Sequence, residues 1–310
     1  MASPYASIDL GTHTTRLLIV SFENNKLRPL FRKRSITKLG FYFDGNNITE
    51  TGINFLIKTL KNFTKIMQLH KVKGYQAIAT AILRQADNSQ KIIETIQKKT
   101  GLEIKVVNGE IEAILTAKGV FSTLEVEKTK SLIVDVGGGS TEFIWPAKKI
   151  ALSLPIGATW LTCQFLKHDP PSLEEINRAF KLTEEKIYNL NIPSPEILVG
   201  TAGTISTLAA IDLKMDVYQP RLINGHILSK NRVLEIFNNL KKLPAKKRCL
   251  IPGLESGREE VILGGSIIVL ALFNIFQKDT LIVSEGGLLE GILIDYLEKI
   301  SKKKNLKIIL

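Results

Sequence analysis

Apolar residues along the chain follow two spacings, and polar or glycine-rich breaks separate the segments that carry them. Short apolar runs predict strands, and apolar residues that recur at helical spacing predict amphipathic helices. The predicted strands are Tyr75 to Thr80, Glu103 to Val107, Ile197 to Gly200 and Leu281 to Ser284. The predicted helices are Thr51 to Gln68, Lys91 to Lys99, Ile111 to Phe121, Leu173 to Leu190, one beginning at Ser206, Arg232 to Leu240, Arg258 to Phe276 and Gly291 to Lys299. This alternation predicts an α/β fold.

Two segments of the chain repeat one pattern. Residues 7–20 read SIDLGTHTTRLLIV and residues 133–146 read IVDVGGGSTEFIWP. A shift of 126 positions aligns Asp9 with Asp135, Gly11 with Gly137, Thr14 with Ser140, and Thr15 with Thr141. Each copy is an apolar run, an Asp, a turn of small residues and a second apolar run, which predicts a β-hairpin. We therefore expect two similar α/β domains, each opening with such a hairpin.

The expected domains are residues 1–124 and 125–310, with the C-terminal helix able to pack back onto the first domain. The polar segment STLEVEKTK, at residues 122–130, is the expected linker because it lacks an apolar face. The tail from residue 302 onward is expected either to extend the last helix or to dock elsewhere.

Composition narrows the class of protein. A length of 310 residues suits two domains, and 44% hydrophobic with 23% charged residues excludes a disordered, collagenous or coiled-coil chain. Cys163 and Cys249 cannot form a disulfide framework or a four-thiolate zinc site, so we expect a reducing, cytoplasmic location. The N-terminus lacks the basic and apolar parts of a signal peptide. The longest apolar run, Ile267 to Phe273, is too short to span a bilayer, so no membrane association is expected.

The excess of 42 Lys and Arg over 30 Asp and Glu gives a net charge of +12. This charge favours anionic partners such as phosphate polymers, nucleotides, nucleic acid or acidic lipid, but a lysine-rich exterior would give the same count. Basic residues gather at Arg28 to Lys38, Lys241 to Arg248 and Lys299 to Lys307. None of these clusters is interleaved with aromatic residues, so specific nucleic-acid binding is not expected.

The segment DVGGGST, from Asp135 to Thr141, carries the clearest chemistry. Three glycines after a buried strand let the backbone approach a ligand, and their N–H groups can converge on an anion. Gly137, Gly138 and Gly139, with the Ser140 and Thr141 hydroxyls, are therefore candidate phosphate ligands. Asp135 and Glu142 would repel phosphate unless a cation lay between them, which indicates Mg²⁺ or another divalent ion such as Mn²⁺. A tight hairpin turn is the less favoured interpretation.

Two further turns are candidate ligand sites. Gly11, Thr12 and Thr14 belong to the counterpart loop, which would face the first across a cleft, with Asp9 reaching the metal through water. His13 in that loop is expected to be a surface turn residue. In GTAGT, Gly203 and Thr204 stand at a strand-to-helix turn that could face an anion or a nucleotide, although close packing explains the glycines equally well. The segment SEGGLLEGIL, at 284–293, is expected to form a helix contact between domains.

These motifs, in this order, resemble the actin-like (ribonuclease H-like) ATPase superfamily, and most closely the exopolyphosphatase and guanosine pentaphosphate phosphatase (Ppx/GppA) family in its short, two-domain form. The matching segments are Ile8 to Leu17 (family IDLGSNSxRL), Ala79 to Asn88 (ATxxLRxAxN), Asp135 to Glu142 (DxGGGSTE), Gly200 to Thr204 (GTAGT) and Gly257 to Gly265 (RADVI-x-x-G). The resemblance implies two actin-like α/β domains flanking a cleft and hydrolysis of a terminal phosphoanhydride.

The resemblance also implies two catalytic residues. The segment NGEIEA, at residues 108–113, aligns Glu112 with the catalytic base of the family. Arg84 lies in the segment that matches ATxxLRxAxN, and the resemblance implies that it binds phosphate. Without the resemblance, we would interpret Glu112 as an ordinary carboxylate that the helix dipole favours at the start of a helix. Arg84 would then be interpreted as a member of a surface salt bridge. The chain departs from the family at His13 (usually Asn), at Glu110 and Ile111, and at Leu289 (commonly Arg).

Polyphosphate is the preferred substrate because a long polyanion suits the basic chain. The alternatives left open are hydrolysis of guanosine pentaphosphate in the stringent response, with guanosine tetraphosphate as a possible ligand, and a non-catalytic nucleotide or polyanion sensor. An ATP-dependent kinase and a filament-forming relative rank lower. A homodimer is possible.

Overall fold

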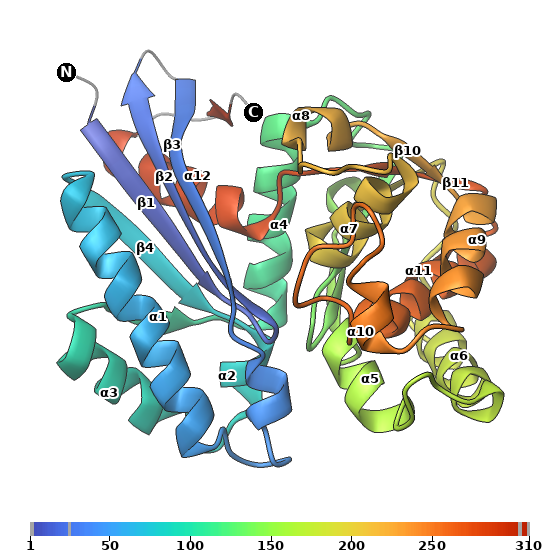
Figure 1. Cartoon of the computed structure of the whole chain (residues 1–310). Coiled ribbons are helices and arrows are strands. Elements are labelled where there is room, and N and C mark those ends of the chain that lie inside the picture. The colour runs from blue at the N-terminus through green and yellow to red at the C-terminus, as the bar shows by residue number, and fades with distance from the viewer. Residues whose placement is uncertain (1–2, 24–25, 303–305, 309–310) are drawn as a thin grey trace. The chain divides into compact units, whose positions relative to one another are not determined.

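The computed structural model describes residues 3–23, 26–302 and 306–308 (Figure 1). The chain divides into two compact units, of which unit 1 comprises Met1–Glu125 with Gly286–Leu310 and unit 2 comprises Val126–Glu285. The first division lies one residue from the boundary expected at 124/125. Residues 286–310 cluster with unit 1, so the last helix belongs to the unit in which the chain begins.

Unit 1 is built on a six-stranded mixed sheet with the order β12-β3-β2-β1-β4-β5. Its strands are β1 (Ser3–Leu10), β2 (Thr14–Glu23), β3 (Lys26–Ile36), β4 (Gly74–Ala79), β5 (Ile104–Val106) and β12 (Lys307–Ile308). Strands β1, β2 and β3 form an antiparallel meander, whereas β4 and β5 continue the sheet in parallel from β1. The tail therefore docks, because β12 pairs in parallel with β3; residues 303–305 and 309–310 lie outside the described residues.

Helices cover both faces of this sheet. They are η1 (Leu39–Tyr42), α1 (Glu50–Leu69), α2 (Ala81–Gln85), α3 (Ser89–Thr100), α4 (Gly109–Thr123) and α12 (Leu288–Ser301). Leu56 of α1 and Ile92 of α3 pack with Ile8 of β1, while Leu293 of α12 packs with Leu18 of β2. Side chains alternate along β1 and β2, so these contacts bury opposite faces.

Glycines allow α12 to pack closely on α4 within unit 1. A Cβ on Gly119 would lie 1.8 Å from the carbonyl oxygen of Gly287, and a Cβ on Gly291 would lie 1.7 Å from that of Leu115. Any side chain at Gly119 or Gly291 would therefore separate the helices. The SEGGLLEGIL segment was expected to form a contact between domains. Its glycines instead contact a helix of the same unit, because α12 belongs to unit 1.

Unit 2 has a second six-stranded mixed sheet, with the order β10-β11-β9-β6-β7-β8. Its strands are β6 (Ser131–Val136), β7 (Thr141–Trp145), β8 (Ile150–Leu154), β9 (Ile197–Thr201), β10 (Ile227–Ser229) and β11 (Thr280–Val283). An antiparallel β6–β7–β8 meander is again continued by parallel strands, here β9 and β11. The order β8-β7-β6-β9-β11 thus repeats β3-β2-β1-β4-β5, as the internal repeat predicts.

The helical elements of unit 2 include the almost wholly apolar α11. They are η2 (Pro146–Lys148), α5 (Ala158–Phe165), α6 (Leu173–Tyr188), α7 (Ala202–Asp212), α8 (Pro220–Ile223), α9 (Lys230–Leu240), α10 (Ala245–Arg248) and α11 (Ile262–Phe276). Helix α11 packs against α5, α6, α7 and α9. Phe273 and Ile267 of α11 are fully buried in the core of this unit. An all-round apolar helix is expected where the core covers every side.

The predicted α/β class and both hairpins are confirmed, and several boundaries are corrected. The helix predicted from Arg258 begins at Ile262, because Gly257 adopts a φ of 90° and turns precede the helix. The helix predicted from Ser206 begins earlier, at Ala202. The segment expected as a linker begins at residue 122, but its first two residues belong to α4. Ser122 is buried there, and its hydroxyl donates to Gly119 O.

Candidate functional site

The turns of the two hairpins share one backbone arrangement. Gly11 N donates to Thr14 O at 3.0 Å, and Gly137 N donates to Ser140 O at 3.0 Å. A Cβ on either glycine would lie 3.0 Å from the same carbonyl oxygen. The repeat in the sequence is therefore a repeat in backbone geometry, and both turns need their first glycine.

The turn of unit 2 presents its amide groups to a ligand. In the described part of the chain, the N–H groups of Gly138, Gly139 and Ser140 donate no backbone hydrogen bond. The carbonyl of Gly138 is held from behind by the N–H groups of Thr159 and Trp160 at the start of α5, at 2.9 and 3.0 Å. A fixed turn with available N–H groups is suited to phosphate oxygens.

Two carboxylates stand opposite one another on the β6–β7 hairpin. Asp135 pairs in register with Glu142, and their exposed fractions are 7% and 1%. The hydroxyls of Ser140 and Ser153 donate to Glu142 Oε1 at 2.6 and 2.7 Å, while Thr141 Oγ1 donates to Ile156 O at 2.6 Å. Directly opposed like charges are unfavourable, so this pair suits a bound cation.

The equivalent position in unit 1 has the opposite charge. Asp9 pairs in register with Arg16, whose Nε and Nη2 donate to Asp9 Oδ2 at 2.8 and 2.5 Å. Asp9 Oδ1 is buried and has no hydrogen-bond partner among the described residues. An orphaned buried carboxylate oxygen is costly in a protein interior, and a water-bridged cation would satisfy it.

Glu112 and Arg84 lie together in unit 1. Asn108 caps the start of α4 by accepting from Ile111 N at 2.9 Å, which places Glu112 in the first turn. Arg84 Nη1 donates to Glu112 Oε2 and to Val107 O, both at 2.9 Å. Within the described chain, Arg84 Nε and Nη2 make no hydrogen bond, so half of the guanidinium fork is available for an anion.

The helical spacing separates the two glutamates of this segment. Glu112 is 6% exposed, whereas Glu110 is exposed on the outer side of α4. His13, by contrast, is not the surface residue that its turn position predicted, since it is only 4% exposed. Its carbonyl accepts from the N–H groups of Thr37 and Lys38, and its ring packs edge-on against Phe41.

The GTAGT turn contacts an arginine that the sequence did not single out. Ala202 adopts a φ of +74°, a strained value for a residue with a Cβ, at the start of α7. A Cβ on Gly203 would lie 1.8 Å from Arg258 Nη2, so the guanidinium covers this glycine. Thr204 is buried against Gly265. Arg258 lies within the family-like GREEVILGG segment, and that segment was the signal that could have revealed it.

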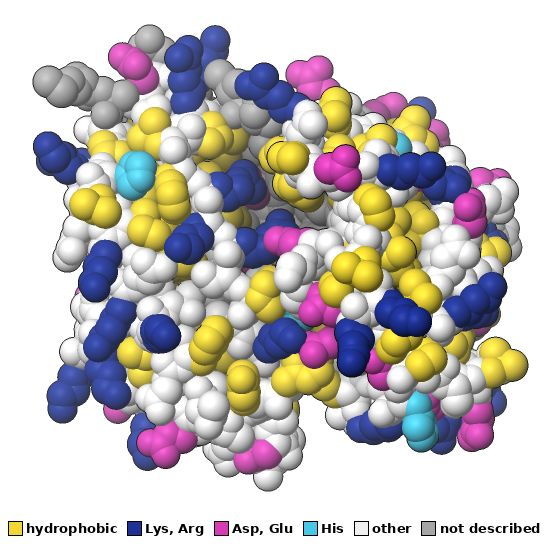
Figure 2. All heavy atoms as spheres, viewed as in Figure 1, with side chains coloured by type: hydrophobic (Ala, Val, Ile, Leu, Met, Phe, Trp, Pro, Cys, Tyr) yellow, Lys and Arg dark blue, Asp and Glu magenta, His cyan; other side chains and the backbone are white. Residues whose placement is uncertain are grey.

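Each basic cluster of the sequence has at least one member in an ion pair. Arg248 is buried and pairs with Asp169 at 2.7 Å, and Lys299 pairs with Asp295 at 2.6 Å. The cluster from Arg28 falls on β3, where Arg32 pairs with buried Glu290 at 2.6 Å. Figure 2 shows Lys and Arg side chains spread over the viewed face among acidic and apolar ones.

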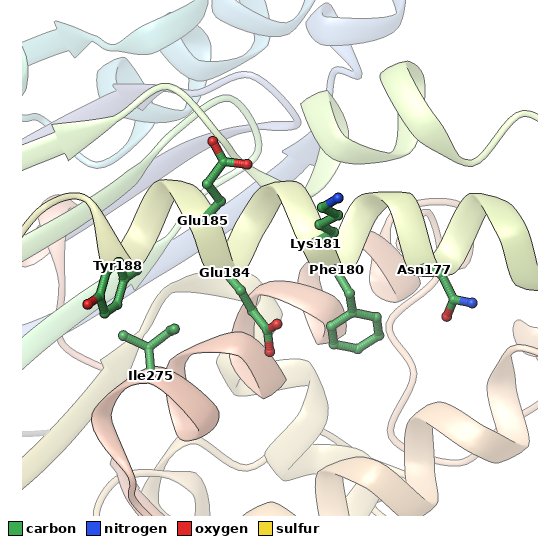
Figure 3. Close-up of a pocket in the computed structure, with 7 residues that line it drawn as sticks. All are labelled: Asn177, Phe180, Lys181, Glu184, Glu185, Tyr188 and Ile275. Carbon is green, nitrogen blue, oxygen red and sulfur yellow. The ribbon is translucent and has the colours of Figure 1, made fainter.

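A hollow of about 560 Å³ on unit 2 contains none of the predicted site residues. It follows the outer side of α6 where Ile275 of α11 approaches, and Figure 3 shows Tyr188 beside that isoleucine. Glu184 and Glu185 oppose a single Lys181 on its wall. Mixed charge and a shallow lining give it no evident phosphate chemistry.

No group of three or more His, Cys, Asp or Glu side chains among the described residues is arranged to hold a metal ion. The predicted ligands Asp135 and Glu142 are adjacent, whereas Asp9 belongs to the other unit. Two carboxylates nonetheless suit Mg²⁺, which commonly binds through one or two carboxylates, water and substrate phosphates. No helix in the described ranges is long and apolar enough to cross a membrane.

Comparison with known proteins accounts for this arrangement of motifs. The model of the Ppx/GppA phosphatase family matches residues 18–300. The chain belongs to the Ppx/GppA phosphatase family. The crystal structure of the Aquifex aeolicus Ppx/GppA family member superposes with a TM-score of 0.81 at 34% identity, covering 97% of this chain and 99% of that one. The chain thus has the α/β fold of Ppx/GppA proteins, with two six-stranded mixed sheets.

Two further relatives carry functional names. The structure of an exopolyphosphatase from Cytophaga hutchinsonii has a TM-score of 0.88 at 27% identity, covering 98% of this chain and 99% of that one. The bifunctional 3-dehydroquinate synthase/phosphatase of Fusobacterium nucleatum is 33% identical over 93% of this chain. The chain spans about half of that longer protein, 46% of its length.

Leu289, where Ppx/GppA proteins commonly have Arg, is accounted for by packing. Its side chain is 1% exposed and lies with Leu18, Val20 and Leu293 in an apolar cluster of unit 1. The neighbouring Glu290 pairs with Arg32 of β3 at 2.6 Å. The departure therefore places a leucine in a dry environment and leaves Glu290 paired.

Proposed function

We propose that this Ppx/GppA protein hydrolyses the terminal phosphoanhydride bond of inorganic polyphosphate with a divalent cation. The observation that carries the proposal is the Glu112–Arg84 pair, which brings the expected base within 2.9 Å of the expected phosphate clamp. The exopolyphosphatase name of the Cytophaga relative and the net charge of +12 favour polyphosphate over a nucleotide.

Glu112 is proposed to position the attacking water and to accept its proton. The water oxygen forms a bond to the terminal phosphorus in line with the bridging oxygen, and the bond from phosphorus to that bridging oxygen breaks. The shortened chain leaves with the bridging oxygen. Arg84 would clamp the terminal phosphate through Nε and Nη2, a bidentate contact that Lys could not reproduce.

The turns of the two hairpins are proposed to hold the phosphates. The N–H groups of Gly138, Gly139 and Ser140 would donate to phosphoryl oxygens as charge develops on them. The backbone of these turns is shaped by Gly11, Gly137 and Thr141. From the loop of unit 1, the hydroxyls of Thr12 and Thr14 would donate to the phosphates. The GTAGT turn would approach a phosphate or a nucleotide through Gly203 and Thr204. Mg²⁺ or Mn²⁺ bound by Asp135 and Glu142, and through water by Asp9, would neutralise phosphate charge.

The test is phosphate release from long-chain polyphosphate and from guanosine pentaphosphate, side by side with Mg²⁺. Glu112→Ala should lower kcat by about 10²- to 10⁴-fold, the usual contribution of a general base. Glu110→Ala is the matched control, because it removes an exposed carboxylate from the same helical turn. It should leave kcat unchanged.

Each result decides one alternative. Faster release from guanosine pentaphosphate would replace polyphosphate as the substrate while keeping the roles of the residues. Binding of either compound without release would favour a sensor. An undiminished Glu112→Ala enzyme would overturn the assignment of the base.

A further inference from the structure

A hollow of about 970 Å³ lies in unit 1 beside the start of β4, at the end of that strand farther from α2 (Figure 1). Its walls come from the end of α1, the beginnings of β4 and β5, and the last turns of α12. This volume falls within the range of about 300–1,000 Å³ that is typical of small-molecule sites. None of the residues proposed for hydrolysis lines it.

The charge around this hollow is positive. Lys71, Lys73 and Lys105 line it, and none of the three forms an ion pair with any residue in the described ranges. Glu103 is the one acidic residue among the lining side chains. Lys299 also lines it, but its ammonium is paired with Asp295 at 2.6 Å. An anion bound in this concavity would be attracted by all three ammonium groups.

The backbone of β4 is open on the side of this hollow. Strand β5 pairs with β4 only from Ala77 to Ala79, so residues 74–76 have β1 on one side and no described strand on the other. Backbone groups that point away from a sheet edge are unsatisfied by the fold. Lys73 N donates to Pro4 O of β1. By alternation, the N–H groups of Gly74 and Gln76 therefore point away from β1 and can donate to an anion next to the lysines.

Two tyrosines complete the walls. A Cβ on Gly74 would lie 2.2 Å from the Tyr296 hydroxyl, so the hydroxyl packs directly on the strand backbone. Burial raises the pKa of Tyr296, with smaller contributions from Tyr5 and Tyr75, so the hydroxyl stays protonated and can donate. The Tyr75 hydroxyl accepts from Glu103 N at 3.0 Å and keeps its own proton for a ligand.

We propose that this hollow binds a small ligand that carries two or more phosphate groups, at a site of its own within unit 1. Lysine is a common point-charge ligand for phosphate, and two ammonium groups from the connection between α1 and β4 and one from β5 match more than one anionic group. A nucleoside diphosphate and a short inorganic polyphosphate share this chemistry. The experiment separates them by comparing ADP with tripolyphosphate.

The first measurement is lysine footprinting of the full chain by acetylation and mass spectrometry, with EDTA present to prevent hydrolysis. ADP or tripolyphosphate should lower the modification rate of Lys71, Lys73 and Lys105 by about tenfold at saturation. Lys58 of α1 and Lys91 of α3 are exposed outside the hollow, and their modification rates should not change. Because the readout is local, it is independent of whether the chain hydrolyses polyphosphate.

The second measurement compares two double variants by calorimetric titration of the compound that gives protection. Lys73→Glu with Lys105→Glu should weaken its binding to this site by at least about tenfold, since two attractive charges are replaced by repulsive ones. Lys58→Glu with Lys91→Glu makes the same charge change elsewhere in the unit and should leave binding within about twofold.

Protection by ADP alone would identify a nucleotide, and equal protection by both compounds would show that the phosphates suffice; either result supports the site. Absence of protection at millimolar concentrations of both compounds would overturn the proposal. Equal weakening in the two double variants would also overturn it, because attraction would then come from net charge and not from this hollow.

Discussion

The β1–β2 hairpin of unit 1 and the β6–β7 hairpin of unit 2 have the same backbone but opposite electrostatics. Both turns close with a glycine N–H donating across the turn at 3.0 Å, and both place an Asp at the same step of the first strand. The cross-strand partner of Asp9 is Arg16, whereas the partner of Asp135 is Glu142. Arg16 and Glu142 occupy equivalent positions, 126 residues apart, and carry opposite charges.

This difference in charge indicates that the two hairpins have different roles in ligand binding. An Asp–Arg pair largely neutralises itself, whereas opposed carboxylates cost about 0.2–1 kcal/mol unless something compensates. The hydroxyls of Ser140 and Ser153 donate to Glu142 Oε1, and a hydroxyl carries no charge. We infer that the acid pair in the hairpin of unit 2 is adapted to a cation, and that the hairpin of unit 1 contributes hydroxyl donors and a water-mediated contact from Asp9.

Among changes in the two hairpins, the largest expected effect comes from removing the charge of Glu142. Glu142→Gln keeps a carbonyl oxygen that can accept from Ser140 and Ser153, so the hairpin should fold. It should lower phosphate release by about a hundredfold or more and raise the magnesium concentration needed for half-maximal rate. Magnesium titrations of phosphate release measure both quantities.

The matched control for this change is Glu196→Gln, which removes an exposed carboxylate of the same unit. It should alter neither the rate nor the magnesium dependence. If Glu142→Gln retained the wild-type magnesium dependence, the distinction between the two hairpins would have no role in cation binding.

The next effect concerns the ion pair of unit 1. Arg16→Gln leaves the nearly buried Asp9 carboxylate without its guanidinium and should lower the free energy of unfolding of unit 1 by about 2–3 kcal/mol. This is less than for a fully buried pair, because the Arg16 side chain is 22% exposed. Amide hydrogen exchange in β1 and β2 reports this unit separately from unit 2.

A double variant sharpens the test. Asp9→Asn combined with Arg16→Gln removes both charges and should recover at least half of the lost stability, because no uncompensated carboxylate remains. A double variant no more stable than Arg16→Gln alone would mean that Arg16 stabilises unit 1 through contacts other than Asp9.

Local patterns predicted more of the fold than of the surroundings of the site. The hairpins followed from apolar runs around small-residue turns, and most helices followed from their periodicity. Strand β3 was not predicted, because its charged residues and Pro29 interrupt the alternation of apolar and polar residues that marks a strand. His13 is buried, and Arg258 packs on Gly203, through tertiary contacts. The periodicity of a local segment carries no information about such contacts. The acid pair was evident because both members belong to one hairpin.

A smaller effect is expected where helix α5 supports the turn of unit 2. A Cβ on Gly157 would lie 2.5 Å from the backbone carbon and oxygen of Gly138. Gly157→Ala should therefore displace the turn and cost about 1–3 kcal/mol, as overpacking usually does. Hydrogen exchange in β6 and β7 measures the loss. Exchange in β1 and β2 should stay unchanged, since the turn of unit 1 is supported by η1, through Gly40 N donating to Thr12 O.

The smallest effect tests whether the two turns are equivalent in backbone. Gly11→Ala and Gly137→Ala each place a Cβ 3.0 Å from a carbonyl oxygen, which requires a shift of a few tenths of an ångström. Each should cost about 1 kcal/mol, and the two losses, read from hydrogen exchange in the respective hairpins, should agree within about 0.5 kcal/mol. Equal stability losses should accompany unequal activity losses, because only the turn of unit 2 adjoins the acid pair. A twofold or larger difference in stability loss would show that the similarity of the turns ends at their hydrogen bonds.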